Sequence, residues 1–167
     1  MLALVLLTLG CNRDEAENRT GQTTVDPGES LIKTNRYLVK SEIEDIENYI
    51  RRHQWEMQET GSGLRYMIAE QGNGPKVEDG DIITIRYNLW LINGNLVYNS
   101  VDDGPKTFLV GKGGVESGLE EGVLLLQEGD KARFILPAHL AYGLLGDEKK
   151  IPPRTAIIYE LELIKIK

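Results

Sequence analysis

The sequence predicts an α+β protein in which a helical arm precedes a curved, mostly antiparallel sheet crossed by one short helix. Two helix-start signatures, with apolar residues at three- and four-residue spacing, predict the arm between residues 26 and 60. After Gly61 the apolar residues alternate with polar ones in a succession of short segments, as strands require. Only one later segment, near Val115, returns to helical spacing. The 167 residues, 41% of them hydrophobic, suffice for one core and an appendage.

The N-terminal residues 1–10 form an almost wholly apolar run that is too short to span a bilayer and is typical of a secretory signal. Cys11, the only cysteine, follows directly and precedes a polar stretch, an order that resembles a bacterial lipobox. We therefore expect cleavage before Cys11 and a lipid anchor on its thiol. The alternative is a buried structural thiol, and a single cysteine excludes an internal disulfide in either case.

Residues 11–25 are polar and predict a flexible, lipidated tether. The capping pattern of residues 26–29 predicts a first arm helix that runs to about Lys40. A second pattern at residues 41–44 predicts another helix, which ends near Gln54 and has one apolar stripe. Because short helices are marginal unless covered, the arm should pack on the following domain or on a second copy of itself.

The following domain, residues 61–167, contains six predicted strands and one predicted helix. The helix should begin near Val115, because Leu119, Val123 and Leu126 share a face. In the last strand the alternation slips by one residue, which predicts a bulge near Leu163. The predicted strands are residues 64–70, 83–91, 96–100, 107–110, 130–136 and 157–167.

Charge and motif content exclude several classes of function. The net charge of −7 and the lack of clustered Lys and Arg argue against nucleic-acid binding. His53 and His139 are isolated, and the sequence contains no metal-ligand cluster, phosphate loop or nucleophile motif. We therefore expect no metal and no cofactor.

Six segments of the domain, taken in order, resemble the FKBP-type peptidyl-prolyl isomerases over residues 62–167. The resemblance implies a half-wrapped antiparallel sheet around one short helix, with an aromatic hollow between them that accepts a proline ring. The segments are Gly80-Asp81, Tyr98-Asn99-Ser100, residues 118–122, residues 140–143, Ile151-Pro152-Pro153 and residues 159–163.

The resemblance also implies which residues form the site. Tyr142 is similar to the family tyrosine whose hydroxyl donates a hydrogen bond to the substrate, and the helix start at Val115 and Glu116 offers a backbone N–H to a peptide carbonyl. Plain core filling is the alternative role for Tyr87 and Tyr142. The implied catalytic residues are Tyr87, Tyr98, Asn99 and Tyr142, and the implied substrate-binding residues are Val115, Glu116, Leu119, Ile151 and Tyr159.

Three positions depart from the family pattern. Asn99 stands where active members usually carry an aspartate, Lys106 where many carry an apolar residue, and Leu119 where a tryptophan is common. Each should loosen proline binding.

Within the family, the anchor, the two-helix arm and residues 145–153 look like the gliding-motility-associated lipoprotein isomerases. This narrower resemblance implies an enzyme that is lipid-anchored at the bacterial envelope, faces the periplasm and acts on proline-containing polypeptide clients. The alternative function is a weakly active or inactive proline-binding module of a membrane-associated assembly such as the gliding machinery. A homodimer formed through the arm is a further possibility.

Overall fold

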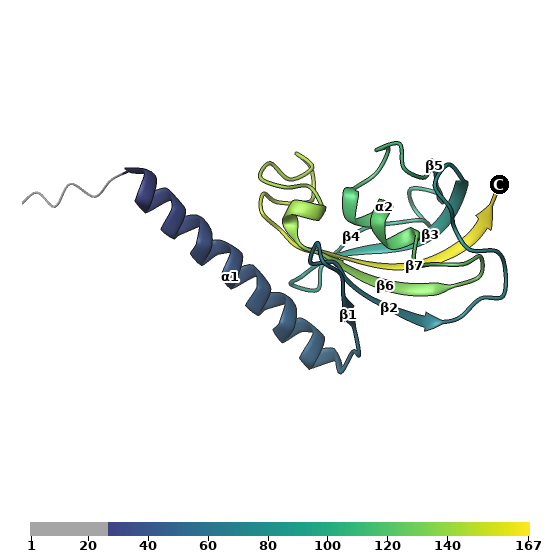
Figure 1. Cartoon of the computed structure of the whole chain (residues 1–167), viewed down its shortest axis with the longest axis horizontal. Helices are drawn as coiled ribbons and strands as arrows, with labels where there is room; N and C mark the ends of the chain where they lie inside the picture. The colour runs from purple at the N-terminus through teal and green to yellow at the C-terminus, as the bar shows by residue number, and fades with distance from the viewer. Residues whose placement is uncertain (1–26) are drawn as a thin grey trace, which may run out of the picture.

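The computed structural model describes residues 27–167, in which a long helix leads into a single curved sheet (Figure 1). The predicted signal segment 1–10, the predicted lipidation site Cys11 and the predicted tether 11–25 lie outside the described residues. The helices are α1 (Pro27–His53), α2 (Ser117–Val123) and the 3-10 turn η1 (Ala138–Leu140). The strands are β1 (Gln58–Glu59), β2 (Arg65–Glu70), β3 (Ile82–Leu91), β4 (Leu96–Asn99), β5 (Lys106–Leu109), β6 (Lys131–Leu136) and β7 (Ile157–Ile166).

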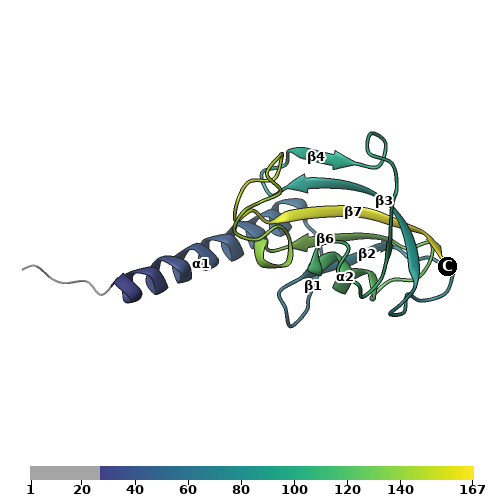
Figure 2. The same ribbon diagram turned by 90° about the horizontal axis from the view of Figure 1, so that it is seen from above.

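The seven strands form one antiparallel sheet, in which six follow the order β1-β2-β6-β7-β3-β4 and β5 pairs with β3 beside that path; Figure 2 shows the sheet from above. The same edge of β3 pairs with β5 over its first residues and with β4 over its last ones. The architecture confirms the predicted α+β class, with an antiparallel sheet around one short helix. The sheet already begins at Gln58, before the expected domain boundary at Gly61.

Helix α2 lies against the sheet because two of its residues have no side chain. A Cβ atom at Gly118 would stand 2.6 Å from Cγ of Leu136, and one at Gly122 would stand 2.6 Å from the ring of Phe134. Both distances are shorter than van der Waals contact allows, so only glycine at these two positions lets the helix pack this closely on β6. Leu119 of the same helix is completely buried in the core.

The predicted bulge in the last strand is confirmed. Ile85 pairs with Leu163 and Thr84 with Lys165, so Ile164 is the extra residue of β7. The bulge explains why the apolar alternation slips there, because an extra residue moves the following side chains to the other face.

The arm is one continuous helix, so the prediction of two helices that meet near Lys40 was wrong. No Gly or Pro occurs between Ser30 and His53, and a capping pattern inside such a run does not interrupt helical hydrogen bonding. The predicted end near Gln54 is confirmed. Gln54 has a φ of 55°, and the N–H of Trp55 donates to the carbonyl of Ile50 at 3.1 Å, which closes a Schellman motif.

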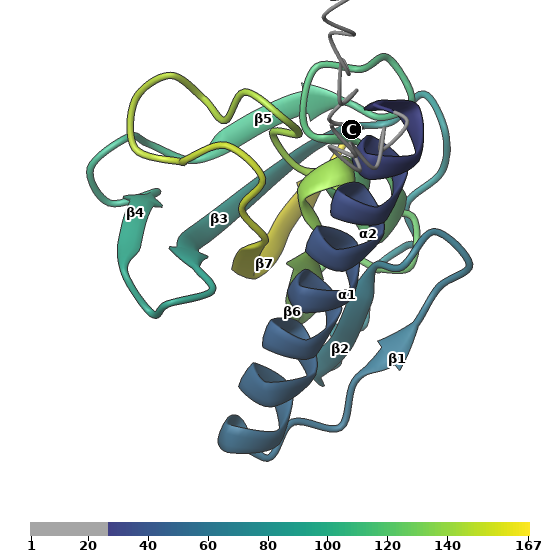
Figure 3. The ribbon, with the colours of Figure 1, turned by 90° about the vertical axis from the view of Figure 1, so that its left-hand side faces the viewer.

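The C-terminal half of α1 packs on its own domain, on the face of the sheet opposite α2. Ile46 and Tyr49 are buried there in a small cluster with Ile135 and Ile158. Figure 3 shows α1 crossing in front of β6, the strand that contributes Ile135. Packing within the chain, one of the two expected modes, therefore covers this half of the stripe.

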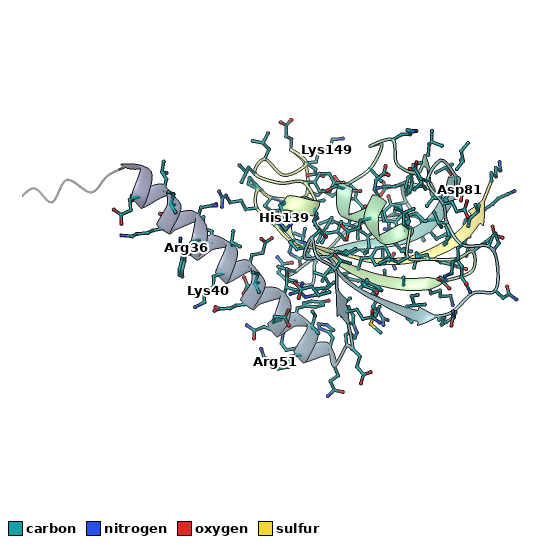
Figure 4. All side chains as sticks on the ribbon, in the orientation of Figure 1. Arg36, Lys40, Arg51, Asp81, His139 and Lys149 are labelled. Atoms are coloured by element: carbon teal, nitrogen blue, oxygen red, sulfur yellow. The ribbon has the colours of Figure 1, made fainter. Side chains whose placement is uncertain are left out.

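The N-terminal half of α1 projects away from the domain (Figure 1). Leu31, Ile32 and Tyr37 are between 61% and 71% exposed, so apolar surface remains uncovered on this half. In Figure 4, Arg36 and Lys40 lie on the side of the helix that faces away from the domain. Within residues 27–167 no helix has both the length and the apolar content needed to cross a membrane.

Candidate active site

Four tyrosines from separate segments converge at one end of the sheet: Tyr87 from β3, Tyr98 from β4, Tyr142 from the segment after η1, and Tyr159 from β7. The rings of Tyr87 and Tyr159 are 5.8 Å apart between centroids and tilted by 56°. Tyr87 points toward the core because the buried residues of β3 alternate with exposed ones. The tyrosines that the resemblance singled out therefore form one cluster.

Three of these tyrosines line an open hollow of about 330 Å³. A hollow of this size, with aromatic walls and a few polar groups, suits a small ring such as that of proline. Its lining consists of Tyr87, Leu89, Tyr98, Asp103, Tyr142, Asp147 and Lys149. Figure 4 shows Lys149 in the loop between η1 and β7.

Three of the expected substrate-binding residues lie below this lining. Leu119 and Tyr159 have no exposed surface, and Ile151 has 2%. Together they belong to the buried core against which Tyr87, Tyr98 and Tyr142 pack, while Val115 is half-buried and packs against the same core. A ligand in the hollow thus meets Tyr87, Tyr98 and Tyr142 first.

The Glu116 side chain reaches into the tyrosine cluster from the residue that precedes α2. Its Oε1 atom accepts a hydrogen bond from the hydroxyl of Tyr159 at 3.0 Å and another from the hydroxyl of Tyr142. Burial, together with the nearby charge of Glu116, raises the pKa of both tyrosines. Both hydroxyls therefore stay protonated at any physiological pH.

Lys106 supplies the countercharge from β5. Its Nζ donates to the hydroxyl of Tyr159 at 3.0 Å and lies 3.6 Å from Oε2 of Glu116. The same ammonium lies 5.2 Å from the ring centroid of Tyr87, within the range of a cation–π interaction. An ion pair thus occupies the space between the tyrosine rings and the start of α2.

A second carboxylate, Asp147, holds the loop that closes the hollow. Its Oδ2 accepts the hydroxyl hydrogen bond of Tyr98, while Oδ1 accepts backbone N–H groups of Lys149 at 2.9 Å, Lys150 at 2.9 Å and Ile151 at 2.7 Å. The hydrogen bond to Asp147, with burial, raises the pKa of Tyr98 to about 12. Burial alone would raise the pKa of Asp147, but these hydrogen bonds outweigh it and lower that pKa.

Asn99 does not line the hollow. Its Oδ1 accepts the backbone N–H groups of Val101 at 2.8 Å and Asp102 at 2.9 Å, and its Nδ2 donates to the Asp102 carboxylate at 2.7 Å. This arrangement stabilises the turn after β4. The catalytic role expected for Asn99 stays a prediction.

Sequence reasoning missed the side-chain roles of Glu116 and Asp147. The role of Glu116 could have been predicted from Lys106, because a cation at a pocket position that is usually apolar needs a partner of opposite charge. Asp147 had no comparable signal. Among residues 27–167, no group of three or more His, Cys, Asp or Glu side chains is placed to hold a metal ion.

A second, larger groove of about 690 Å³ lies between α1 and the domain. Its walls include Leu38 and Ile43 of α1 and Pro137 and Leu144 near η1. It lacks the tyrosine cluster, so we place the candidate site in the smaller hollow.

A curved antiparallel sheet around one short helix, with tyrosines gathered above that helix, defines an FKBP-like domain. The profile of the FKBP-type peptidyl-prolyl cis-trans isomerases matches residues 74–164. This match spans more than half of the sequence, and the chain belongs to this family.

Two bacterial relatives illustrate the extent of the similarity. The probable FKBP-type isomerase FkpA of Neisseria meningitidis serogroup B is 40% identical over 64% of this chain and 39% of the relative. The FK506-binding protein of the same organism is 36% identical over 62% of this chain and 96% of that protein. The chain thus covers about two fifths of its FkpA relative and nearly all of the shorter one.

Two solved structures share the fold. The crystal structure of FkpA from Escherichia coli matches 84% of this chain and 65% of its own, with a TM-score of 0.68 and 27% identity. AtFKBP13 matches 68% of this chain and 100% of its own, with a TM-score of 0.65 and 30% identity.

Proposed function

We propose that this chain is a peptidyl-prolyl cis-trans isomerase that rotates X-Pro bonds of polypeptide clients in the hollow of Tyr87, Tyr98 and Tyr142. The convergence of these three tyrosines around an open cavity, in a chain of this family, is the observation that carries the proposal. The match to the FK506-binding protein of Neisseria meningitidis, which covers 96% of that protein, further supports the proposal.

The reaction requires no nucleophile. Rotation about the X-Pro bond is slow because it breaks amide resonance, at a barrier of about 20 kcal/mol. The twisted amide has lost the charge separation that water solvates, so a desolvating aromatic hollow favours it over the planar ground state. The Tyr142 hydroxyl and the backbone N–H of Glu116 are the donors that we assign to the client's carbonyl oxygens.

A protease-coupled assay on proline tetrapeptides tests this function. We expect the wild-type protein to accelerate isomerisation above the thermal rate and Tyr87→Ala to lose most of that acceleration. The matched control is Tyr37→Ala, because Tyr37 is 71% exposed on α1 and does not line the hollow. Activity at the thermal rate in the wild type would reject the function.

A second candidate is a weakly active or inactive proline-binding module in a membrane-associated assembly such as the gliding machinery. Lys106 favours it, because a charged side chain, paired here with Glu116, stands where many family members carry an apolar residue. This function predicts that peptides bind with little or no turnover. Peptide titration alongside the kinetic assay distinguishes the two candidates.

We also propose that the protein is anchored by lipid on Cys11 at the bacterial envelope and faces the periplasm. The apolar run before Cys11 supports this location. Metabolic labelling with a palmitate analogue should mark the wild type and not Cys11→Ser. Labelling of both, or of neither, would contradict the anchor.

A homodimer through the arm is supported by the apolar residues of the N-terminal half of α1. Leu31 and Ile32 are 71% and 61% exposed and lie on a helix end that projects away from its own domain. Light scattering should report a dimer for the wild type and a monomer for Leu31→Ser with Ile32→Ser. A wild-type monomer would reject the dimer.

A further inference from the structure

The most unusual chemistry near the hollow is the buried carboxylate of Glu116. Its side chain is 5% exposed, and its Oε1 atom accepts both tyrosine hydroxyls. Its Oε2 atom has no hydrogen-bond partner among the described residues, and its neighbouring charge is Lys106 Nζ at 3.6 Å. A buried charge is stable only when it is paired, so Glu116 and Lys106 hold each other in place.

This arrangement occupies the groups that a client would use. A tyrosine hydroxyl carries one proton, so Tyr142 cannot donate to a client carbonyl while it donates to Glu116. The Lys106 ammonium lies 5.2 Å from the centroid of the Tyr87 ring, on which a proline ring would pack, and is hydrogen-bonded to the hydroxyl end of Tyr159. The Tyr159 ring beneath it has no exposed surface.

We propose that Lys106 and Glu116 form an internal gate, which lowers client affinity by holding the Tyr142 hydroxyl and covering the base of the hollow. The gate rests on the proposed function, because it acts on the same hollow. A client enters when the ammonium of Lys106 swings outward and the Tyr142 hydroxyl turns from Glu116 to the client's carbonyl oxygen.

Two features allow the gate to open. The side chain of Lys106 is 26% exposed, so its flexible stem reaches solvent from its present position. Tyr142 lies in the irregular segment after η1, outside the sheet and two residues before the 66% exposed Leu144. Glu116 is buried at the start of α2 and is the fixed part.

The test replaces the whole pair, Lys106→Met with Glu116→Leu, because removing both charges together leaves neither of them buried and unpaired. The buried Tyr159 hydroxyl loses both partners in this variant, so its stability should fall, and thermal melting checks that it is folded. Lys106→Met with Glu116→Gln is the more conservative second variant. Both should bind a proline tetrapeptide more tightly than the wild type, the first by about tenfold, because the client no longer competes with a charged hydrogen bond. Binding is measured by peptide titration and turnover by the coupled assay.

Tyr142→Phe adds a readout that a structural role would not move. In the wild type we expect it to change affinity less than about twofold, since the hydroxyl is already engaged, whereas in the gate-free background it should cost about tenfold. The control is Lys131→Met with Glu70→Gln, which removes an exposed ion pair from the edge of the sheet. This control should match the wild type.

Each result decides between the two proposals. Tighter binding by the gate-free variants without turnover in any form would support the gate and reject the isomerase. Turnover in all forms, with equal affinities and an equal Tyr142→Phe effect in both backgrounds, would support the isomerase and overturn the gate. Weaker binding by both folded variants, judged by thermal melting, would also overturn it.

Discussion

Tyr98 on β4 donates its hydroxyl hydrogen bond to Asp147, a residue of the loop that precedes β7. The contact joins two walls of the hollow that are far apart in the sequence. Lys150 reinforces it, because its Nζ lies 4.7 Å from the centroid of the Tyr98 ring and donates to the carbonyl of Val97 at 2.8 Å. The loop between η1 and β7 is therefore fixed to β4 through side chains.

Asp147→Asn should destabilise the protein by about 2 kcal/mol at neutral pH, because an amide nitrogen cannot accept the Tyr98 hydroxyl. Since folding lowers the pKa of Asp147 below 3.8, its contribution is fully present above that pH and is lost as the pH falls through the folded value. Urea unfolding of both proteins between pH 7 and pH 2 measures the difference. A gap that stays constant or widens toward pH 2 would contradict this role.

Gly122→Ala should cost about 2 kcal/mol or more, because the new methyl group would stand 2.6 Å from the Phe134 ring. The helix must then lift from β6, which also displaces Glu116. Gly61→Ala is the matched control, since a Cβ atom there meets nothing within 4 Å. Thermal melting of the two variants should separate them clearly, and equal melting temperatures would show that α2 is not held by this approach.

Ile46→Ala should cost about 3 kcal/mol, because the side chain is 1% exposed between α1 and the sheet. Ile32→Ala, on the projecting half of the same helix, should change stability by less than about 0.5 kcal/mol in the monomer. Urea unfolding at low protein concentration makes the comparison. Equal effects at the two positions would mean that α1 does not dock as described.

Local patterns predicted much of the fold. The alternation of apolar and polar residues located the long strands, and the slip in that alternation located the bulge at Ile164. This works because each strand residue must be apolar or polar according to the face of the sheet to which its side chain points. The continuity of α1 was missed, since a capping pattern is local and its effect depends on whether the chain has a reason to turn. Strands β6 and β7 cover the residues of α1 that follow Ser41, so the chain has no reason to turn at Ser41.

The site was predictable only in part. The tyrosines were identified through the family's segments, whereas the pairing of Lys106 with Glu116 depends on two elements that only the folded sheet brings together. Asp147 was missed for the same reason, because its partner Tyr98 is on a distant strand.

The central claim is that proline binds among Tyr87, Tyr98 and Tyr142, and NMR titration of the labelled protein with a proline tetrapeptide tests it most directly. We expect the backbone signals around these three tyrosines to shift, and the peptide's cis and trans signals to exchange faster than in free solution. Shifts confined to the groove between α1 and Pro137, with unchanged peptide exchange, would contradict the claim.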